Sequence, residues 1–169
     1  AVGVYQANSA PLPEGFPPPT APNQIEVKEY PPYRAATYPT QGNLGQAANQ
    51  AFYPLYQHIS SNNISMTAPV ETRYPVGTLE GDLSGEAEVS FLYRNSEINP
   101  TEIGSQIEVK DIPAMTVVSL GLKGAYSYES YQDGLKQLTQ WLNNHPEYER
   151  VGNPRRFFYD GPYVPDALK

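Results

Sequence analysis

Apolar residues recur along this chain with two different periods, and each period predicts a different element. Apolar and polar residues alternate around Ile25 and again over Tyr33–Tyr38, which predicts a strand interrupted at Pro31-Pro32 by a bulge or a strand edge. From Leu44 to Ile59 apolar residues recur every three or four positions, which predicts a helix with one apolar face. Pro54 lies within this pattern, so we expect a kink or a helix that restarts with proline in its first turn.

The rest of the chain is expected to form two more strands and then to repeat the same order of elements. The two strands cover Ile64–Thr72 and Ala87–Tyr93, on either side of a loop at about Pro75–Gly85. The second half predicts strands at Gln106–Asp111 and Ala114–Lys123, a helix at about Tyr126–Asn144 and a strand near Arg150–Tyr159.

A nearly identical heptad begins each half. Residues 25–31 read IEVKEYP and residues 107–113 read IEVKDIP, so the second copy follows the first by 82 residues. The flanking elements keep this offset, which predicts an α+β fold with a pseudo-twofold duplicated β-α-β-β unit. The repeat also predicts a last strand at about residues 169–176. Either the C-terminus has been lost, or a sheet edge is left open for another chain or for the Pro-rich tail.

We place the folded domain at residues 24–169 and a Pro-rich N-terminal extension at residues 1–23. Proline favours extended backbone and cannot donate to a ladder, so the extension is a spacer, or it lies on its own domain or on a neighbouring subunit. The absence of cysteine excludes disulfides and thiolate metal sites. No apolar stretch approaches the roughly 20 residues that cross a bilayer, so no transmembrane segment is expected.

The charge balance argues against one class of partner. Eleven basic and 18 acidic residues give a net charge of −7, which would repel a phosphate backbone, so we expect no nucleic-acid partner. The chain begins with Ala1 rather than methionine, and we expect an exported protein, periplasmic, extracellular or lumenal, after removal of a leader. A cloning boundary would look the same, and a cytoplasmic location stays open.

One segment carries a family resemblance. Residues 63–70 read NISMTAPV after a helix that ends YPLYQHI, and this combination resembles the signature of the SOUL haem-binding protein family. Three further segments, EVKEY at 26–30, VSF at 89–91 and YDGP at 159–162, follow in the order that the family shows. The resemblance covers about residues 24–168. It implies a curved antiparallel sheet or distorted barrel with two helices, similar to the effector-binding domains of bacterial multidrug regulators.

The resemblance also implies a ligand, haem or a related tetrapyrrole, in a shallow apolar groove beside the first helix. Seven residues are candidates for contact with it: Ala51, Leu55, His58, Met66, Arg155, Arg156 and Phe158. Imidazole is a common axial ligand of haem iron, so His58 is the candidate metal ligand, although a histidine near a helix C-terminus is also favoured by the helix dipole. Met66 either contacts the tetrapyrrole, as a lining residue or as a soft sulfur ligand of the iron, or belongs to the core.

Two arginines are the candidates for binding the propionates. Arg155 and Arg156 precede Phe158, and a guanidinium can bind a carboxylate through two hydrogen bonds. Because successive residues of a strand face opposite sides, at most one of them can point into a given groove, and ordinary strand surface charge is the alternative. Glu29 stands where some relatives have an axial histidine, a departure that disfavours ligation of that type.

The residues favour binding over catalysis. We find no set of nucleophile, base and orienting residue, no glycine-rich phosphate loop and no dense carboxylate cluster. The leading hypothesis is a non-catalytic tetrapyrrole-binding module that buffers or carries haem. The alternative is a structural or accessory subunit that uses the fold as a scaffold, without haem, and meets a protein partner through the Pro-rich tail or an open sheet edge. Opening of the haem macrocycle, reported for some members of the family, is the enzymatic alternative.

Overall fold

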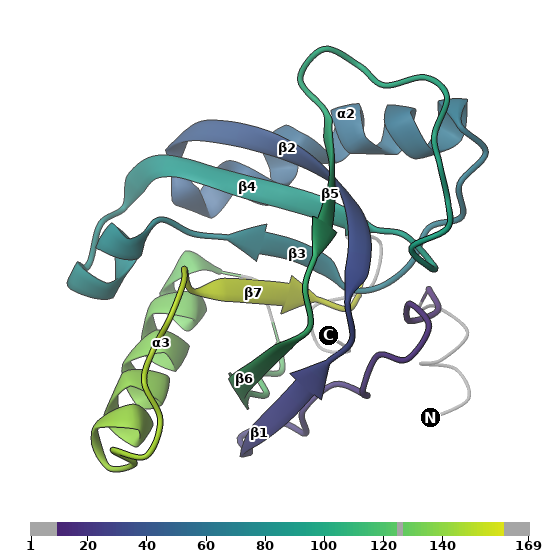
Figure 1. Ribbon diagram of the computed structural model, residues 1–169. Helices are drawn as coiled ribbons and strands as arrows, with labels where there is room; N and C mark the ends of the chain where they lie inside the picture. The colour runs from purple at the N-terminus through teal and green to yellow at the C-terminus, as the bar shows by residue number, and fades with distance from the viewer. Residues whose placement is uncertain (1–9, 125–126, 161–169) are drawn as a thin grey trace.

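Two units with the same order of elements follow one another along the chain, in a computed structural model that describes residues 10–124 and 127–160 (Figure 1). The first unit contains β1 (Ile25–Tyr30), β2 (Tyr33–Asn43), a 3₁₀ turn (Leu44–Gln46), α2 (Ala47–Ser61), β3 (Val70–Arg73), a second 3₁₀ turn (Val76–Glu80) and β4 (Ser84–Leu92). The second contains β5 (Glu108–Ile112), β6 (Met115–Leu120), α3 (Tyr128–Asn143) and β7 (Arg155–Phe158). The last strand predicted by the repeat lies outside the described residues.

The units exchange their first strands. β1 pairs with β6 and β5 pairs with β2, and both ladders are antiparallel. Tyr30 faces Met115 in one ladder, and Ile112 faces Tyr33 in the other. Each pair maps onto the other by the same offset of 82 residues that separates the two heptads. The duplication predicted from the sequence is therefore confirmed as a structural pseudo-twofold.

The strands form one five-stranded sheet and one two-stranded sheet. The order of the larger sheet is β5-β2-β4-β3-β7, and β1 with β6 forms the smaller. β3 and β7 are equivalent strands of the two units, and they pair antiparallel. The predicted α+β class with a curved antiparallel sheet and two helices is confirmed. A closed barrel is not formed, because no ladder joins β6 to β7 among the described residues.

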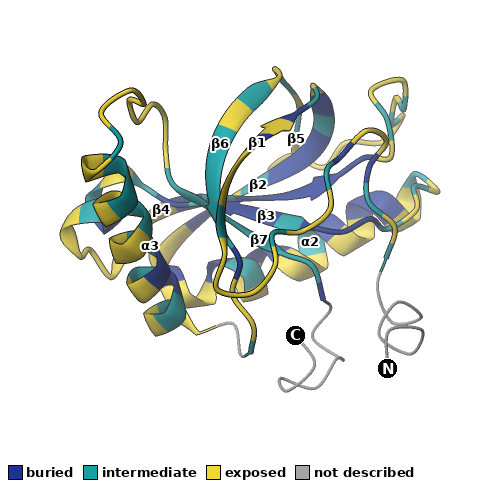
Figure 2. Cartoon of the chain, turned by 90° about the horizontal axis from the view of Figure 1, so that it is seen from below, coloured by how far each residue is buried: buried dark blue, intermediate teal, exposed yellow. Residues whose placement is uncertain are grey.

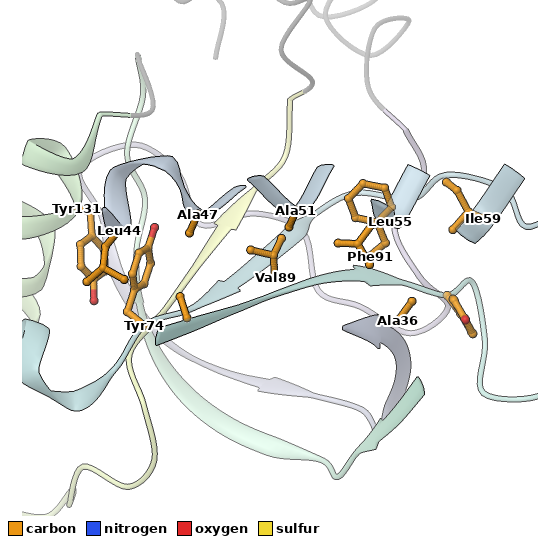
Figure 3. Packing of buried hydrophobic residues seen from close by; sticks show 12 residues of the cluster. Ala36, Leu44, Ala47, Ala51, Leu55, Ile59, Tyr74, Val89, Phe91 and Tyr131 are labelled. Atoms are coloured by element: carbon orange, nitrogen blue, oxygen red, sulfur yellow. The ribbon is translucent and has the colours of Figure 1, made fainter. Parts of the chain in front are cut away.

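The main core lies between α2 and the larger sheet (Figure 3). Ala51, Leu55 and Ile59 lie on one face of α2 and are almost fully buried. Val89 and Phe91 belong to the same cluster and rise from alternate positions of β4, so both point to the face that the helix covers. The apolar stripe predicted for this helix is therefore buried by the strand of its own unit.

The boundaries of several elements differ from those predicted. Leu44–Gln46 form a 3₁₀ turn, so α2 begins three residues later, and the side chain of Asn43 accepts a hydrogen bond from Gly45 at this turn. α2 continues through Pro54 to Ser61. The strand expected from Ile64 begins only at Val70, since the N–H of Ala68 donates to the carbonyl of Pro11 instead of joining a ladder.

Residues 10–22 of the Pro-rich extension lie on their own domain. Phe16 is buried, and its ring meets those of Tyr30 and Tyr33 edge-on, with centroids 5.1 and 5.2 Å apart. The ammonium of Lys28 donates to the carbonyl of Pro18 at 2.8 Å. Of the alternatives left open, attachment to the chain's own domain therefore holds for this part of the extension, and residues 1–9 lie outside the described residues.

Candidate ligand-binding cleft

A cleft of about 1390 Å³ opens between α3, β6 and β7. Its apolar lining includes Leu120 and Val118 of β6 and Leu135, Leu138 and Leu142 of α3. The N-terminal segment around residues 19–22 and the connection at 148–154 form its sides. A typical small-molecule pocket measures roughly 300–1,000 Å³, so this cleft can hold a large planar ligand or a segment of chain.

The helix that forms one wall is defined by its cap and its apolar stripe. The side chain of Ser127 caps α3 by accepting a hydrogen bond from the N–H of Ser130 at 3.1 Å. Tyr131, Leu135 and Leu138 then recur at intervals of four and three residues, which places them on one face of the helix. That face borders the cleft.

The two helices of the repeat differ in how far their apolar faces are buried. Ala51 and Leu55 of α2 are 0% exposed, whereas Leu135, Leu138 and Leu142 of α3 are only partly buried. The same contrast is visible between the strands, because β2 and β4 each contain five buried residues, whereas every residue of β6 is intermediate or exposed (Figure 2). The wall of the cleft is therefore apolar surface that the described residues do not cover.

Basic residues outnumber acidic ones around the cleft, although the chain as a whole is acidic. Four lining residues are basic, Lys123, Arg150, Arg155 and Arg156, and two are acidic, Glu149 and Asp160. The local excess of positive charge stands against a net charge of −7 for the whole chain. The cleft therefore favours an apolar ligand that carries negative groups.

Arg155 compensates a buried carboxylate. Its Nη1 donates to Oε2 of Glu71 at 2.8 Å, and the side chain of Glu71 is 2% exposed. The hydroxyl of Tyr33 donates to the other carboxylate oxygen, also at 2.8 Å. Burial, together with the negative charge of Glu71, raises the pKa of Tyr33, so its hydroxyl remains a donor. This arginine is thus committed mainly to the stability of the sheet.

Arg156 joins β7 to the start of α3. Its Nη1 donates to the carbonyl of Ser127 at 2.8 Å, and its Nη2 donates to Oγ of Ser130 at 2.7 Å. The guanidinium carbon lies 5.0 Å from the ring centroid of Phe158, two residues along the same strand. The guanidinium is therefore held in place at the wall of the cleft by the cap of the helix.

His58 is buried and lies on the face of α2 that packs against the core. Its Nε2 is hydrogen-bonded to the hydroxyl of Tyr93 at 2.6 Å, and the two rings stack with centroids 6.2 Å apart. Nδ1 is buried and has no hydrogen-bond partner among the described residues. Burial lowers the pKa of His58 and raises that of Tyr93 to about 12, so both rings are uncharged at neutral pH.

The structure separates the seven candidate residues into two groups. Ala51, Leu55 and His58 are buried under α2, and Met66 packs against the same core. The face of α2 that carries Ala51 and Leu55 packs against the larger sheet. Arg155 and Arg156 instead line the cleft beside α3, and Phe158 contacts Arg156 without lining it. The assignment of the first group to a tetrapyrrole site stays a prediction, and the described cleft lies elsewhere.

No group of three or more histidine, cysteine, aspartate or glutamate side chains that could hold a metal ion occurs in the described part of the chain. Nor does any helix in residues 10–124 and 127–160 have the length and apolar character needed to cross a membrane. The residues of α3 that line the cleft were not among the sequence candidates. The signal that could have found them is the repeat, which predicts a strand beside β6 that the described residues lack.

The buried imidazole predicts a dependence of stability on pH. Since the pKa of His58 is lowered from 6.5 by burial, the unfolded chain takes up this proton at higher pH than the folded protein. Stability from this residue is present above the unfolded pKa and declines as the pH falls below it, by at most about 1.4 kcal/mol per pH unit. Urea unfolding between pH 7.5 and 5.5 measures this slope.

The two histidines provide a matched pair for this measurement. His58→Gln can keep a hydrogen bond to Tyr93 but removes the titrating ring, so the slope is expected to flatten. His145 is less buried, with its Nδ1 2.7 Å from the carbonyl of Trp141, and His145→Gln is expected to leave the slope as it is. Equal slopes for His58→Gln and the wild type would show that another group controls the dependence.

Comparison with solved structures shows the fold. The crystal structure of the EcmrR C-terminal domain superposes with a TM-score of 0.67 at 20% identity, covering 83% of this chain and 86% of that one. The chain in the cryo-EM structure of the EcmrR–DNA complex in EcmrR-RPo gives a TM-score of 0.65 at 20% identity. That match covers 82% of this chain and half of the other. At this identity the likeness concerns the fold alone.

Sequence comparison gives the family. No curated protein matches the chain. The model of the SOUL heme-binding protein family matches residues 19–168, which is nearly the whole chain and includes the last part of the Pro-rich segment. With the duplicated architecture and the NISMTAPV segment at 63–70, this match shows that the chain belongs to the SOUL heme-binding protein family.

Proposed function

We propose that this protein binds haem or a related tetrapyrrole without transforming it, as a buffer or carrier, and that the ligand lies in the cleft between α3, β6 and β7. Membership of the SOUL heme-binding protein family supports the choice of ligand. The observation that carries the choice of site is an apolar cleft bordered by Lys123, Arg150 and Arg156, besides the arginine that compensates Glu71, in a chain of net charge −7.

The chemistry of a porphyrin matches this surface in two respects. Its ring is a flat apolar plate, and removing it from water contributes about 25 cal/mol for each Å² buried. Leu135, Leu138 and Leu142 offer partly exposed apolar surface for such a plate. Its two propionates need cations, and Lys123 and Arg150 are exposed basic residues of the lining. Arg156 adds a guanidinium whose position is set by the helix cap.

The lining does not offer a strong ligand for iron. No histidine belongs to it among the described residues, and the sulfur of Met115 already accepts a hydrogen bond from Arg155 at 3.1 Å. Burial raises the pKa of Tyr131 and of Tyr159, so both phenols remain protonated and bind iron poorly. We therefore propose that burial and charge hold the ligand, and that the iron-free porphyrin binds about as well as haem.

Titration with haemin tests the proposal. Trp141 is the single tryptophan, and its ring lies 5.7 Å from that of Tyr148, which lines the cleft. We expect saturable quenching of its fluorescence and a Soret shift at micromolar haemin. Leu138→Glu places a charge on the apolar wall and is expected to weaken binding at least about tenfold, equivalent to 1.4 kcal/mol.

A variant on the same helix provides the control. Gln140 is exposed and does not line the cleft, so Gln140→Glu adds the same charge to α3 and is expected to leave haemin affinity unchanged. His58→Gln is expected to have no effect on affinity or on the Soret band, because His58 does not line the cleft. Absence of saturable binding to the wild type would overturn the function. Loss of binding in His58→Gln alone would move the site to the side of α2.

A second function, that of an accessory subunit, is favoured by one specific observation. Two strand edges, those of β6 and β7 that face the cleft, have no partner strand among the described residues. Unpaired strand edges are sites at which another polypeptide can add a strand.

A further inference from the structure

The outer face of α2, which points away from the core, carries exposed aromatic side chains. Tyr53, Tyr56 and Phe52 are 67, 50 and 37% exposed. Tyr53 and Tyr56 recur with Asn49 and Ser60 every three or four residues, so these four residues form one stripe of the helix. The rings of Phe52 and Tyr56 stack, with centroids 6.1 Å apart and 9° between their planes. The outer face therefore presents flat aromatic surface to water.

This face carries no charged side chain. Aspartate, glutamate, lysine and arginine are absent between Arg34 and Glu71, although they make up 17% of the whole chain. The helix of the second unit differs, because Glu129, Asp133 and Lys136 of α3 are all charged and exposed. Since both helices occupy the same place in the repeated unit, the fold itself does not require an uncharged outer face. The lack of charge is a property of α2.

The exposure of the outer face does not depend on the residues that are not described. The first unit is described without a gap from β1 to β4, and β4 covers the inner side of α2. By the repeat, a strand that follows β7 belongs between β6 and β7, on the inner side of α3. The repeat assigns no strand to the outer side of either helix.

The chemistry of the face suits a contact with a second copy of itself. In a twofold contact the same patch lies on both sides, so a charged residue near the axis would face a like charge. The amides of Asn49 and Gln57 and the hydroxyls of Tyr53, Tyr56 and Ser60 avoid this conflict, because each can both donate and accept hydrogen bonds. Two copies of net charge −7 can therefore meet here without opposing like charges.

The area of the face fits a weak dimer. A buried tyrosine or phenylalanine side chain contributes about 150–250 Å². From their exposed fractions, Phe52, Tyr53 and Tyr56 together offer roughly 300 Å² per copy. With the amides beside them, two copies bury roughly 1,000 Å² in total, which is near the lower limit for a specific interface. Aromatic enrichment and depletion of charge are also the composition of interface cores.

We propose that two copies of this chain associate through the outer faces of α2, helix against helix, in a transient twofold dimer. The aromatic rings form the centre of the contact, and the amides and hydroxyls form hydrogen bonds between the copies. A different protein that covers the same face is the rival partner.

Analytical ultracentrifugation of the full chain without haemin tests the dimer. From about 1 μM to about 500 μM we expect a monomer–dimer equilibrium, with a dissociation constant on the order of 10–100 μM. Tyr53→Glu places two carboxylates opposite each other and is expected to weaken the dimer at least about tenfold. Gln140→Glu adds the same charge to the exposed side of α3 and is expected to leave the dimer unchanged. A monomer at every concentration, or equal weakening by both variants, overturns the proposal.

Cross-linking locates the contact without a change of charge. The chain has no cysteine, so a single introduced thiol can link only to the same position of another copy. On oxidation we expect Tyr53→Cys or Tyr56→Cys to form the disulfide-linked dimer at least about tenfold faster than Gln140→Cys, because only a thiol near the twofold axis lies within disulfide reach of its copy. Faster linkage through Gln140→Cys would place the contact on α3 and overturn the proposal.

The response to salt gives an independent check. Raising the ionic strength from about 0.05 M to about 0.5 M is expected to strengthen the dimer severalfold, because salt screens the repulsion between two copies of charge −7. Weakening by salt would show that opposite charges hold the copies together, and would overturn a contact between uncharged faces.

The dimer does not depend on the tetrapyrrole proposal, because the face and the cleft share no residue among those described. A chain that binds haemin and stays monomeric would overturn the dimer and leave the proposed function in place. A chain that dimerises through α2 and binds no haemin would do the reverse.

Discussion

Replacing Arg155 with methionine is expected to lower the free energy of unfolding by about 3 kcal/mol, near the lower end of the range for breaking a buried ion pair. The carboxylate of Glu71 is 2% exposed and, of the side-chain partners seen in residues 10–124 and 127–160, would retain the hydroxyl of Tyr33. The lower end applies because the side chain of Arg155 is 21% exposed, so water can reach part of the site. Urea unfolding at pH 7 measures the loss.

The neighbouring arginine is the matched control. Arg156 donates to the carbonyl of Ser127 and to Oγ of Ser130, which are uncharged acceptors, so Arg156→Met is expected to cost less than Arg155→Met, about 1 kcal/mol for each of these hydrogen bonds. The double variant with Glu71→Gln should recover part of the loss in Arg155→Met, because the two residues interact directly. Strict additivity of the two changes would contradict the ion pair as the cause.

Truncation of Leu55 to alanine is expected to destabilise the protein by about 3 kcal/mol, within the range for a buried leucine. The side chain is 0% exposed and packs in the cluster that contains Val89 and Phe91 (Figure 3). Its removal therefore loses apolar burial and leaves a cavity between α2 and β4. Thermal and urea unfolding measure the effect.

Leu138→Ala on the second helix is the matched comparison. Leu138 has the same side chain on the equivalent helix but is only partly buried, at the wall of the cleft. Its truncation is expected to cost about 1 kcal/mol, because less apolar surface is returned to water. An equal cost for Leu138→Ala and Leu55→Ala would show that the cleft is already filled in solution.

The duplication could be predicted because it is visible in local patterns of the sequence. The heptads at 25–31 and 107–113 and the two helical stripes give the order of elements and the offset between units. The register follows, since Tyr30 and Ile112 hold equivalent positions in the two exchanged ladders. Element boundaries were less accurate where tertiary hydrogen bonds compete with the ladder, as at Ala68.

The sequence could not place the cleft beside α3, because an apolar stripe does not identify its partner. Ala51 and Leu55 lie on a stripe of the expected kind, but that stripe is covered by the chain's own strand. Leu135 and Leu138 lie on a similar stripe and remain partly exposed. Nothing in either helical pattern separates a face that packs on β4 from a face that borders a cleft.

The chain's residues by themselves establish a doubled α+β unit, the absence of cysteine chemistry and membership of a haem-binding family, because periodicity, composition and motifs are properties of the linear order. The position of the cleft, the burial of His58 beside Tyr93 and the packing of Phe16 emerge only from the folded chain. Each of them depends on contacts between segments that are far apart in the sequence. Such contacts decide which groups are buried and which charges are paired.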